Sequence, residues 1–426
     1  MGRNEDKRRS YVHPQHLREA RAPRLWLRNL LAALLAVVIF AGSAAAFMGL
    51  NLMSAVNVSS ADDLLDRAPS DSYAGRALNI LVIGSDSRRG AGNKIDNSED
   101  TSDRSDTTMI VHVSKDRKRA TIVSLPRDTL VDIPACKLPD GSSTRPQRGQ
   151  FNWAFTFGGE SGSRDAAIAC TVKTVEDITQ LHIDDYVLVD FNGFTQMIDA
   201  LGGIDVYVDQ AVRDRNTDLD LAVGCHHMGG HEALQYARVR HGVQGGDGSD
   251  LQRIGRQQHV MSIMMRQALS KNLLTSGPSL YKFARAGLSA LTMSPTLSDL
   301  STMTGLSYSL RGIDPANVLF LSAPVTPSTV DPNRVVFTDA AGALWEALRT
   351  DSALPGGLEV KDGYSTASSP RIRQPHPRQP RTARQHRPAM RRQPPRLPRR
   401  VRRRAPTTRL RNSRRRGASA RRRDSR

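Results

Sequence analysis

The chain has 426 residues, 38% of them hydrophobic, and a formal net charge of +19, so it is long enough for one large domain or two ordinary ones. About 23 arginines and one acid follow Pro370, which leaves about −3 on the first 370 residues. The body of the protein is therefore not basic, and its charge gives no reason to expect nucleic-acid binding.

The segment from Leu30 to Leu50 contains no charged residue and is long enough to cross a bilayer as a helix. A cleaved signal peptide is the alternative, because Ala44–Ala46 offers a small-residue cleavage site. We favour an uncleaved anchor over residues 30–53, since apolar residues continue to Met53.

Basic residues are frequent in the segment 1–29, whereas Asp62, Asp63 and Asp66 follow the apolar run. The positive-inside rule then predicts a cytoplasmic segment 1–29, with everything after residue 53 outside. This is the topology of a single-pass protein of the cell membrane. A Ser/Asp-rich linker, residues 54–75, is expected to lead to the first strand.

Three apolar runs predict three strands whose ends carry charged residues. The run LNILVIGSD ends at Asp86, and the strand TTMIVHVS follows Asp106. The third, RATIVSLPRD, ends in a turn with Arg127 and Asp128. We therefore expect three strand ends to bring acids and one arginine together.

Further along, helices and strands alternate, which predicts an α/β domain over residues 76–350. Helices are expected over 163–181, 191–203 and 251–270, strands over 185–191 and 203–208, and a short helix or turn over 231–240. The chain after the α/β domain, residues 351–426, is expected to be a disordered tail rich in Arg and Pro, because almost no aliphatic residue occurs after Ser369.

The acids Asp86 and Asp106, with Asp103 and Asp128 near by in sequence, form the first candidate site. Magnesium typically takes one or two protein carboxylates and keeps its other positions for phosphate and water. The alternative is that these acids are solvated loop residues and helix caps.

A basic cluster forms the second candidate site: Arg238, Arg240, Arg253 and Arg256, followed by Gln257. Arg238 and Arg240 would share one face of an extended segment, and Arg253 and Arg256 share one face of a helix. Planar guanidinium groups bind phosphate oxygens in pairs, as a pyrophosphate requires. A charged helix that faces solvent is the alternative.

The three cysteines have no CxxC and no Cys/His spacing of a zinc site. In an exported domain we favour a disulfide between Cys136 and Cys170 with Cys225 left over; three buried reduced cysteines are the alternative. His226, His227 and His231 lack the partners of a metal site. The apolar residues of the predicted helix over 251–270 fit either a lipid slot or ordinary core: Ile254, Val260, Met261, Ile263, Met264 and Met265.

Seven motifs, in order, resemble those of the LytR-CpsA-Psr family of the actinobacterial type: NILVIGSDSR, RSDTTMIVHV, IVSLPRD, FNWAFTFGG, MIDALGGIDVYV, GGHEALQYARVRH and DLQRIGRQQ. The resemblance covers about residues 77–350. It implies a central mixed β-sheet flanked by helices, with an apolar groove for a polyprenyl chain.

The resemblance also implies a phosphotransferase that moves a glycopolymer from a polyprenyl-pyrophosphate carrier to peptidoglycan, with Mg²⁺ or Mn²⁺ and with a pyrophosphatase side activity. By motif, Asp86 and Asp106 would hold the metal, and Arg127, Arg238, Arg240 and Arg253 would bind the pyrophosphate. Arg88, Arg104, Arg256 and Gln257 would support them, and Asp86 is the candidate base.

The spacer between Asp86 and Asp106 is longer than the usual pattern of the family, which leaves open whether the two acids meet. The expected partners are the lipid-linked glycan, peptidoglycan and the membrane, with no nucleic acid. A cytoplasmic regulator that uses the basic tail, or a non-catalytic wall-binding protein, is the rival interpretation.

Overall fold

A computed structural model of the chain describes residues 25–65, 73–86, 104–214, 219–239, 242–244, 246, 248–268 and 276–362. Arg88, Arg240, the first 24 residues and the chain after residue 362 lie outside the described residues. The predicted roles of these two arginines and the predicted disorder of the tail therefore stay predictions.

The core of the protein is a mixed sheet of eight strands in the order β1-β12-β7-β2-β3-β4-β13-β16. Their bounds are Asn57–Val58 (β1), Leu291–Met293 (β12), Asp185–Val189 (β7), Leu78–Ser85 (β2), Ser105–Val113 (β3), Ala120–Leu125 (β4), Val318–Ser322 (β13) and Lys361–Asp362 (β16). β2, β3 and β4 form an antiparallel meander, while β7 runs parallel to β2 and β13 parallel to β4. The mixed sheet expected from the sequence is confirmed.

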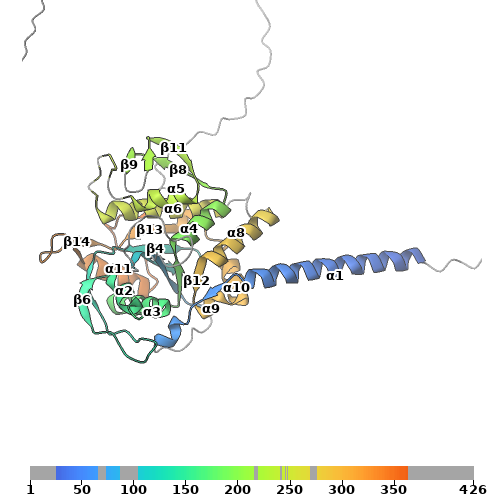
Figure 1. Cartoon of the computed structure of the whole chain (residues 1–426), viewed down its shortest axis with the longest axis horizontal. Coiled ribbons are helices and arrows are strands. Elements are labelled where there is room, and N and C mark those ends of the chain that lie inside the picture. Colours follow the sequence, from blue (N-terminus) through green and yellow to red (C-terminus); the bar gives the residue numbers. More distant parts are fainter. Residues whose placement is uncertain are drawn as a thin grey trace, which may run out of the picture. The chain divides into compact units, whose positions relative to one another are not determined.

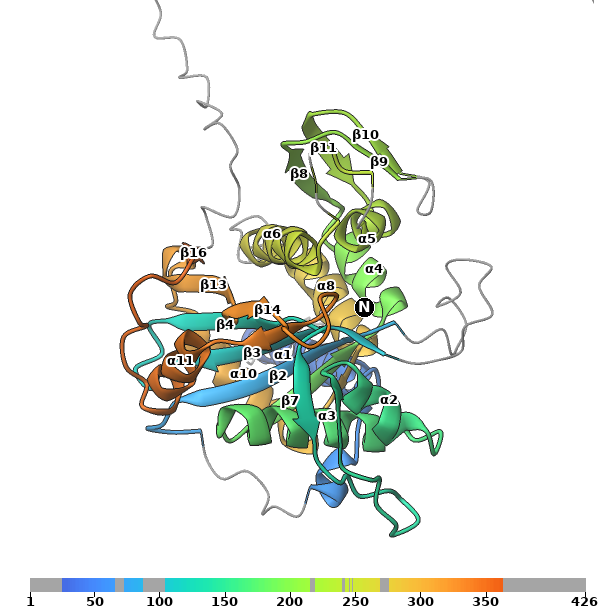
Figure 2. The same ribbon diagram turned by 90° about the vertical axis from the view of Figure 1, so that its left-hand side faces the viewer.

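Helices cover both faces of this sheet because its central strands carry apolar side chains in both directions. On one face, Ile110 and Val123 share a buried cluster with Phe155, Ile168 and Trp345. These belong to α2 (Trp153–Gly159), α3 (Arg164–Thr179) and α11 (Asp339–Arg349). Figure 2 shows α3 and α11 on one side of the strands and α6 on the other.

The opposite face is covered by α6 (Asp250–Ala268), whose Met261 and Met265 pack against buried Met109, Ile122 and Phe320. The other side of α6 packs into a second cluster, through Val260, Ile263 and Met264. The apolar residues of α6 thus pack against the central sheet on one side and against the second cluster on the other. Met261 and Met265 pack against the sheet and Met264 packs against the second cluster, where the sequence left a lipid slot and plain core as alternatives.

The second cluster joins α6 to a small outer layer. Its members are α4 (Phe191–Ala200), α5 (Gly230–Arg238), β8 (Ile204–Val208), β9 (Val212–Asp214), β10 (Leu219–Leu221) and β11 (Gly224–Met228). Figure 1 shows β8, β9 and β11 beyond α5 and α6 from the central strands. The predicted strand over 203–208 is confirmed, but it pairs with β11 and does not join the central sheet.

The N-terminal helix α1 (Leu25–Met53) includes one stretch, Asn29–Met53, that is long and apolar enough to cross a membrane. Directly after it, β1 pairs in parallel with β12 at the edge of the central sheet. Ser59 and Ser60 then donate hydrogen bonds to Asp165 of α3, at 2.6 and 2.8 Å. The first part of the expected linker is thus built into the domain.

Candidate active site

The two candidate acids lie at the same end of neighbouring strands. β2 ends at Ser85, which pairs with Ser105 at the beginning of β3. Asp86 follows β2 directly, and its backbone N–H donates to the Arg104 carbonyl at 3.0 Å. The residues on either side of the long spacer 87–103, Asp86 and Arg104, are therefore hydrogen-bonded neighbours. The question left open by the spacer is settled: Asp86 and Asp106 are neighbours.

Asp86 is buried enough for its environment to change its chemistry. Burial and then the charge of Asp106 raise the pKa of Asp86 to about 7. The backbone N–H of Arg104 donates to Asp86 Oδ1 at 2.7 Å and partly opposes this rise, because the hydrogen bond favours the charged form. At neutral pH this carboxyl is therefore poised between its two protonation states, which suits a general base.

Arg127 lies two residues beyond the end of β4, where the turn after the strand turns it toward the acids. Its Nη1 forms an ion pair with Asp106 Oδ1, and its Nε lies 3.7 Å from both Asp128 Oδ1 and Asp250 Oδ1. Burial lowers the pKa of Arg127, but Asp106, Asp128 and Asp250 more than offset this and raise it. The guanidinium is permanently charged and surrounded by acids.

Arg253 is only 3% exposed and reaches the same cluster from α6. Its Nη2 donates to the backbone carbonyl of Asp106 at 3.0 Å and pairs with Asp250 Oδ1 at 2.5 Å. Asp250, the first residue of α6, therefore bridges Arg127 and Arg253. Two guanidinium groups from separate parts of the chain are held beside the two carboxylates.

The remaining residues of the basic cluster lie around this centre. Arg256 donates through Nη2 to the carbonyl of Val239, the residue that caps the C-terminal end of α5. Gln257 lies half-buried on α6, and the neighbouring Gln258 donates to Ser124 Oγ of β4 at 3.0 Å. Arg256 thus ties α6 to the chain that leads toward Arg240.

Arg238 is the last residue of helix α5, so the short helix expected over 231–240 is confirmed, and Arg238 does not lie on the extended segment on which it would share a face with Arg240. The apolar residues Ala233, Leu234 and Ala237 are buried on α5, and this burial favours a helix as far as Arg238. Its guanidinium lies over the ring of Phe191, 4.4 Å from the ring centroid. Phe191 begins α4 directly after β7, at the same end of the sheet as Asp86.

Two functional neighbours were missed by sequence reasoning. Asp250 bridges the arginines, and Phe191 supports Arg238. The first had a signal, because Asp250 opens the motif DLQRIGRQQ three residues before Arg253. The second had none, since contact between Phe191 and Arg238 depends on how α4 and α5 pack.

The donor set fits a hard divalent cation that shares its coordination with substrate. Two adjacent carboxylates are present. Burial and then the charge of Asp106 raise the pKa of Asp86, and a cation would relieve the repulsion between the two acids. Among the residues that the structure describes, no group of three or more His, Cys, Asp or Glu could hold a metal ion. A cation here would therefore depend on phosphate oxygens and water for its other ligands.

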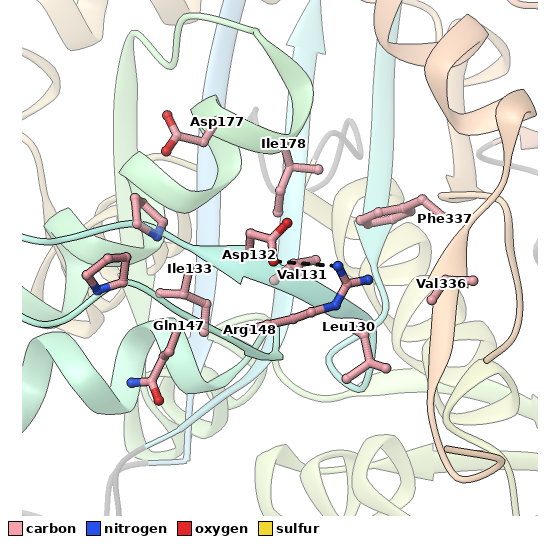
Figure 3. Close-up of a pocket in the computed structure, with 12 residues that line it drawn as sticks. Leu130, Val131, Asp132, Ile133, Gln147, Arg148, Asp177, Ile178, Val336 and Phe337 are labelled. Carbon is pink, nitrogen blue, oxygen red and sulfur yellow. Dashed lines mark ion pairs between the residues drawn. The ribbon is translucent and has the colours of Figure 1, made fainter. Parts of the chain in front are cut away.

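After Arg127 the chain forms the hairpin of β5 (Leu130–Ile133) and β6 (Gln147–Gln150). A groove of about 720 Å³ lies between this hairpin, the end of α3 and β15 (Val335–Phe337). Figure 3 shows Asp132 and Arg148 paired within it, beside Ile133 and Phe337. None of the described site residues lines this groove, which sets it apart from the acid and arginine cluster.

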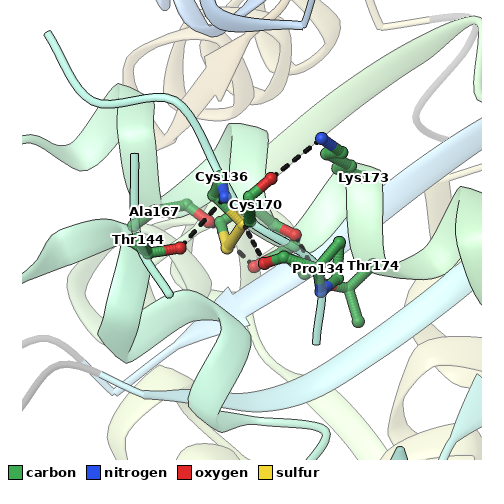
Figure 4. The surroundings of a disulfide bond; sticks show 9 residues. Pro134, Cys136, Thr144, Ala167, Cys170, Lys173 and Thr174 are labelled. Atoms are coloured by element: carbon green, nitrogen blue, oxygen red, sulfur yellow. Dashed lines mark hydrogen bonds between the residues drawn. A yellow bond between two sulfur atoms is a disulfide. The ribbon is translucent and has the colours of Figure 1, made fainter. Parts of the chain in front are cut away.

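A disulfide joins the loop of this hairpin to α3. Cys136 and Cys170 are bonded, both buried, whereas Cys225 is free and exposed. Around the bond, the Cys136 N–H donates to Thr144 Oγ1 at 3.0 Å and Lys173 Nζ donates to the Ala135 carbonyl at 2.8 Å (Figure 4). The favoured pairing is confirmed.

Comparison with known proteins agrees with this architecture. The model of the LytR_cpsA_psr family matches residues 48–373. The cell wall biosynthesis protein LcpA of Corynebacterium glutamicum is 32% identical over 267 residues, which are 59% of this chain and 50% of that protein. The chain thus spans about half the length of that relative.

A second relative is matched over most of its length. The polyisoprenyl-teichoic acid–peptidoglycan teichoic acid transferase TagT of Bacillus subtilis is 25% identical over 325 residues, 72% of this chain and 92% of TagT. Among solved structures, protein gbs0355 of Streptococcus agalactiae aligns with a TM-score of 0.51 at 21% identity, over 67% of this chain and 93% of that protein. This likeness supports the fold.

Proposed function

The chain belongs to the LytR-CpsA-Psr family, and we propose that it transfers a glycopolymer from a polyprenyl-pyrophosphate carrier to peptidoglycan. The observation that carries the proposal is the cluster of Asp86 and Asp106 with Arg127 and Arg253 at one end of the sheet. Two carboxylates and two guanidinium groups are the elements that a pyrophosphate with a bound cation needs.

In the proposed reaction an acceptor hydroxyl attacks the phosphorus that bears the glycan. An O–P bond forms as the bridging P–O bond of the pyrophosphate breaks, and polyprenyl monophosphate leaves with that electron pair. Arg127 and Arg253 compensate the charge on the leaving phosphate. The proton of the hydroxyl passes to Asp86, whose pKa of about 7 suits a base at neutral pH. Water in place of the acceptor would give the pyrophosphatase side activity.

Asp86 and Asp106 are the residues that would hold Mg²⁺ or Mn²⁺, which when bound would neutralise charge on the pyrophosphate oxygens. Asp86 therefore carries two proposed roles. They are separable by experiment, because a cation on this carboxylate lowers its pKa whereas a base needs the pKa raised.

The sheet topology supports a substrate that is held by the membrane. Gly84 of β2 pairs with Val189 of β7, and Val189 pairs with Leu291 of β12. β12 pairs with β1, which follows α1. The chain from α1 thus reaches the sheet at the end where Asp86 lies. Three strand spacings of about 4.8 Å each separate β1 from β2, so Asp86 lies roughly 15 Å across the sheet from the strand that follows α1.

We propose that residues 30–53 of α1 span the cell membrane, with residues 1–29 in the cytoplasm and the domain outside. Its apolar length fits a bilayer, and the Cys136–Cys170 disulfide fits an oxidising compartment. A strain that lacks the protein should lose one class of wall-linked glycan, measured by mass spectrometry of purified walls. Complementation with Asp86→Asn should not restore it; full restoration would favour a non-catalytic wall-binding role.

A further inference from the structure

A groove of about 1040 Å³ lies where α1 leaves the expected membrane span, between its end and α8 (Gly277–Ala290). Met48 and Ala55 line it on one side, and Tyr281, Lys282, Arg285 and Ser289 of α8 line it on the other. It is separate from the acid and arginine cluster, none of whose described residues lines it.

The lining residues of α8 lie on one face of the helix. Tyr281, Lys282, Arg285 and Ser289 follow the spacing of neighbours on a helical surface. On the other side, α8 packs closely on α4, where a Cβ added at Gly193 would meet the carbonyl of Ala290 at 2.4 Å. One face of α8 therefore holds the helix in the domain, and the other is left toward the groove.

The charge of the groove is positive. Lys282 and Arg285 are both exposed, and α8 contains no acid. Among the described residues neither cation is paired with a carboxylate. A half-buried tyrosine beside two long basic side chains is the composition that favours the boundary between acyl chains and headgroups.

The groove is also fixed relative to the anchor. Leu52, Ala55 and Val56 pack against the cluster of Leu288 and Met293. Asn57 Nδ2 donates to the carbonyl of Ser289 at 3.0 Å. Because Met48 belongs to the stretch Asn29–Met53, the groove begins inside the expected span and continues past its end.

We propose that this groove binds a phospholipid of the leaflet that α1 leaves, with an anionic headgroup phosphate held by Lys282 and Arg285. The apolar side chains of Met48 and Ala55 contact the upper part of an acyl chain. The inference rests on the proposed membrane anchor. Its consequence is orientation: α8 ends where β12 begins, at the end of the sheet that carries Asp86, so a bound lipid holds the active site toward the membrane surface.

The test uses the full chain in mild detergent, mixed with phosphatidylglycerol or phosphatidylcholine at equal concentration, and counts retained lipid by native mass spectrometry. We expect the wild type to retain phosphatidylglycerol in preference. The variant K282Q/R285Q should bind it roughly thirtyfold more weakly, since each basic residue near an anionic surface contributes about 1 kcal/mol.

The matched control is K115Q/K118Q, which removes two exposed lysines at the turn between β3 and β4, at the opposite end of the sheet. It should retain lipid as the wild type does, and so should Arg285→Lys. An unchanged preference in K282Q/R285Q, or no preference in the wild type, overturns the proposal. Displacement of the lipid by an equal amount of polyprenyl monophosphate also overturns it, by making the groove a donor site. Lipid retention is measured without turnover, so its outcome is independent of the proposed transferase reaction.

Discussion

Arg127 and Asp106 form an ion pair across the ends of β4 and β3. The pair joins the arginine proposed for the pyrophosphate to a carboxylate proposed for the cation. Each compensates the charge of the other before substrate binds. A pyrophosphate with its cation offers both groups new partners, because the phosphate attracts Arg127 and the cation attracts Asp106. Binding is therefore expected to exchange one set of ion pairs for another without leaving a buried charge alone.

The two acids should respond differently to loss of charge. Burial and Asp106 raise the pKa of Asp86 in the folded protein to about 7. The folded state therefore loses stability as the pH rises from the pKa of the unfolded chain toward 7, and the loss is complete above pH 7. Asp86→Asn should therefore raise the melting temperature at pH 8, measured without divalent cations. Asp106→Asn should lower it, because Arg127 loses its ion-pair partner. Both should abolish transfer; equal melting shifts of the same sign would contradict this assignment.

Arg127 and Arg253 should act as one phosphate clamp. Lysine keeps the charge but loses the planar pair of donors, so Arg127→Lys or Arg253→Lys should lower turnover by about ten- to a thousandfold. The double variant should lose less than the product of the single losses, because both arginines share Asp106 and Asp250. Steady-state rates of the four proteins test this, with Arg148→Lys, exposed and remote on β6, as control. Multiplicative losses would show independent roles.

Cation dependence should change with pH in a defined direction. With a pKa of about 7, Asp86 is half protonated near neutrality and must lose its proton to hold a cation. The Mg²⁺ concentration for half-maximal rate should rise by about tenfold for each pH unit below 7 and level off above it. Initial rates over a grid of pH and Mg²⁺ measure this. A requirement independent of pH between 6 and 8 would remove Asp86 from the cation site and leave it the role of base.

The disulfide should stabilise the fold without taking part in the chemistry. It closes a loop over a sequence separation of 34 and fixes the hairpin that follows Arg127 to α3. C136S/C170S should lose about 3–4 kcal/mol of unfolding free energy. Cys225→Ser is the matched control; it alters an exposed free thiol and should change stability by less than about 0.5 kcal/mol. Chemical denaturation of the three proteins decides the matter.

The sequence predicted the strand ends that carry Asp86, Asp106 and Arg127, because each follows or precedes a short apolar run that is bounded by polar or turn residues. It could not predict that Asp250 bridges Arg127 and Arg253, since that contact depends on where α6 crosses the sheet. Nor did it predict β12, only three residues long, or its partner β1. Such short strands have no periodic pattern and exist because the chain from α1 pairs there. Only the strand register therefore shows that Asp86 lies at the end of the sheet where the chain enters from α1.

In the proposed reaction, the site formed by Asp86, Arg127 and Arg253 breaks the pyrophosphate of a lipid-linked glycan and passes the glycan phosphate to a wall acceptor. The most direct test incubates the full chain with a polyprenyl-pyrophosphate glycan, labelled in the glycan, and with peptidoglycan and Mg²⁺. We expect label on the peptidoglycan and an equal amount of released polyprenyl monophosphate, and we expect Asp86→Asn to abolish both. Intact donor after incubation with a folded wild-type protein, or transfer that persists in Asp86→Asn, would contradict it.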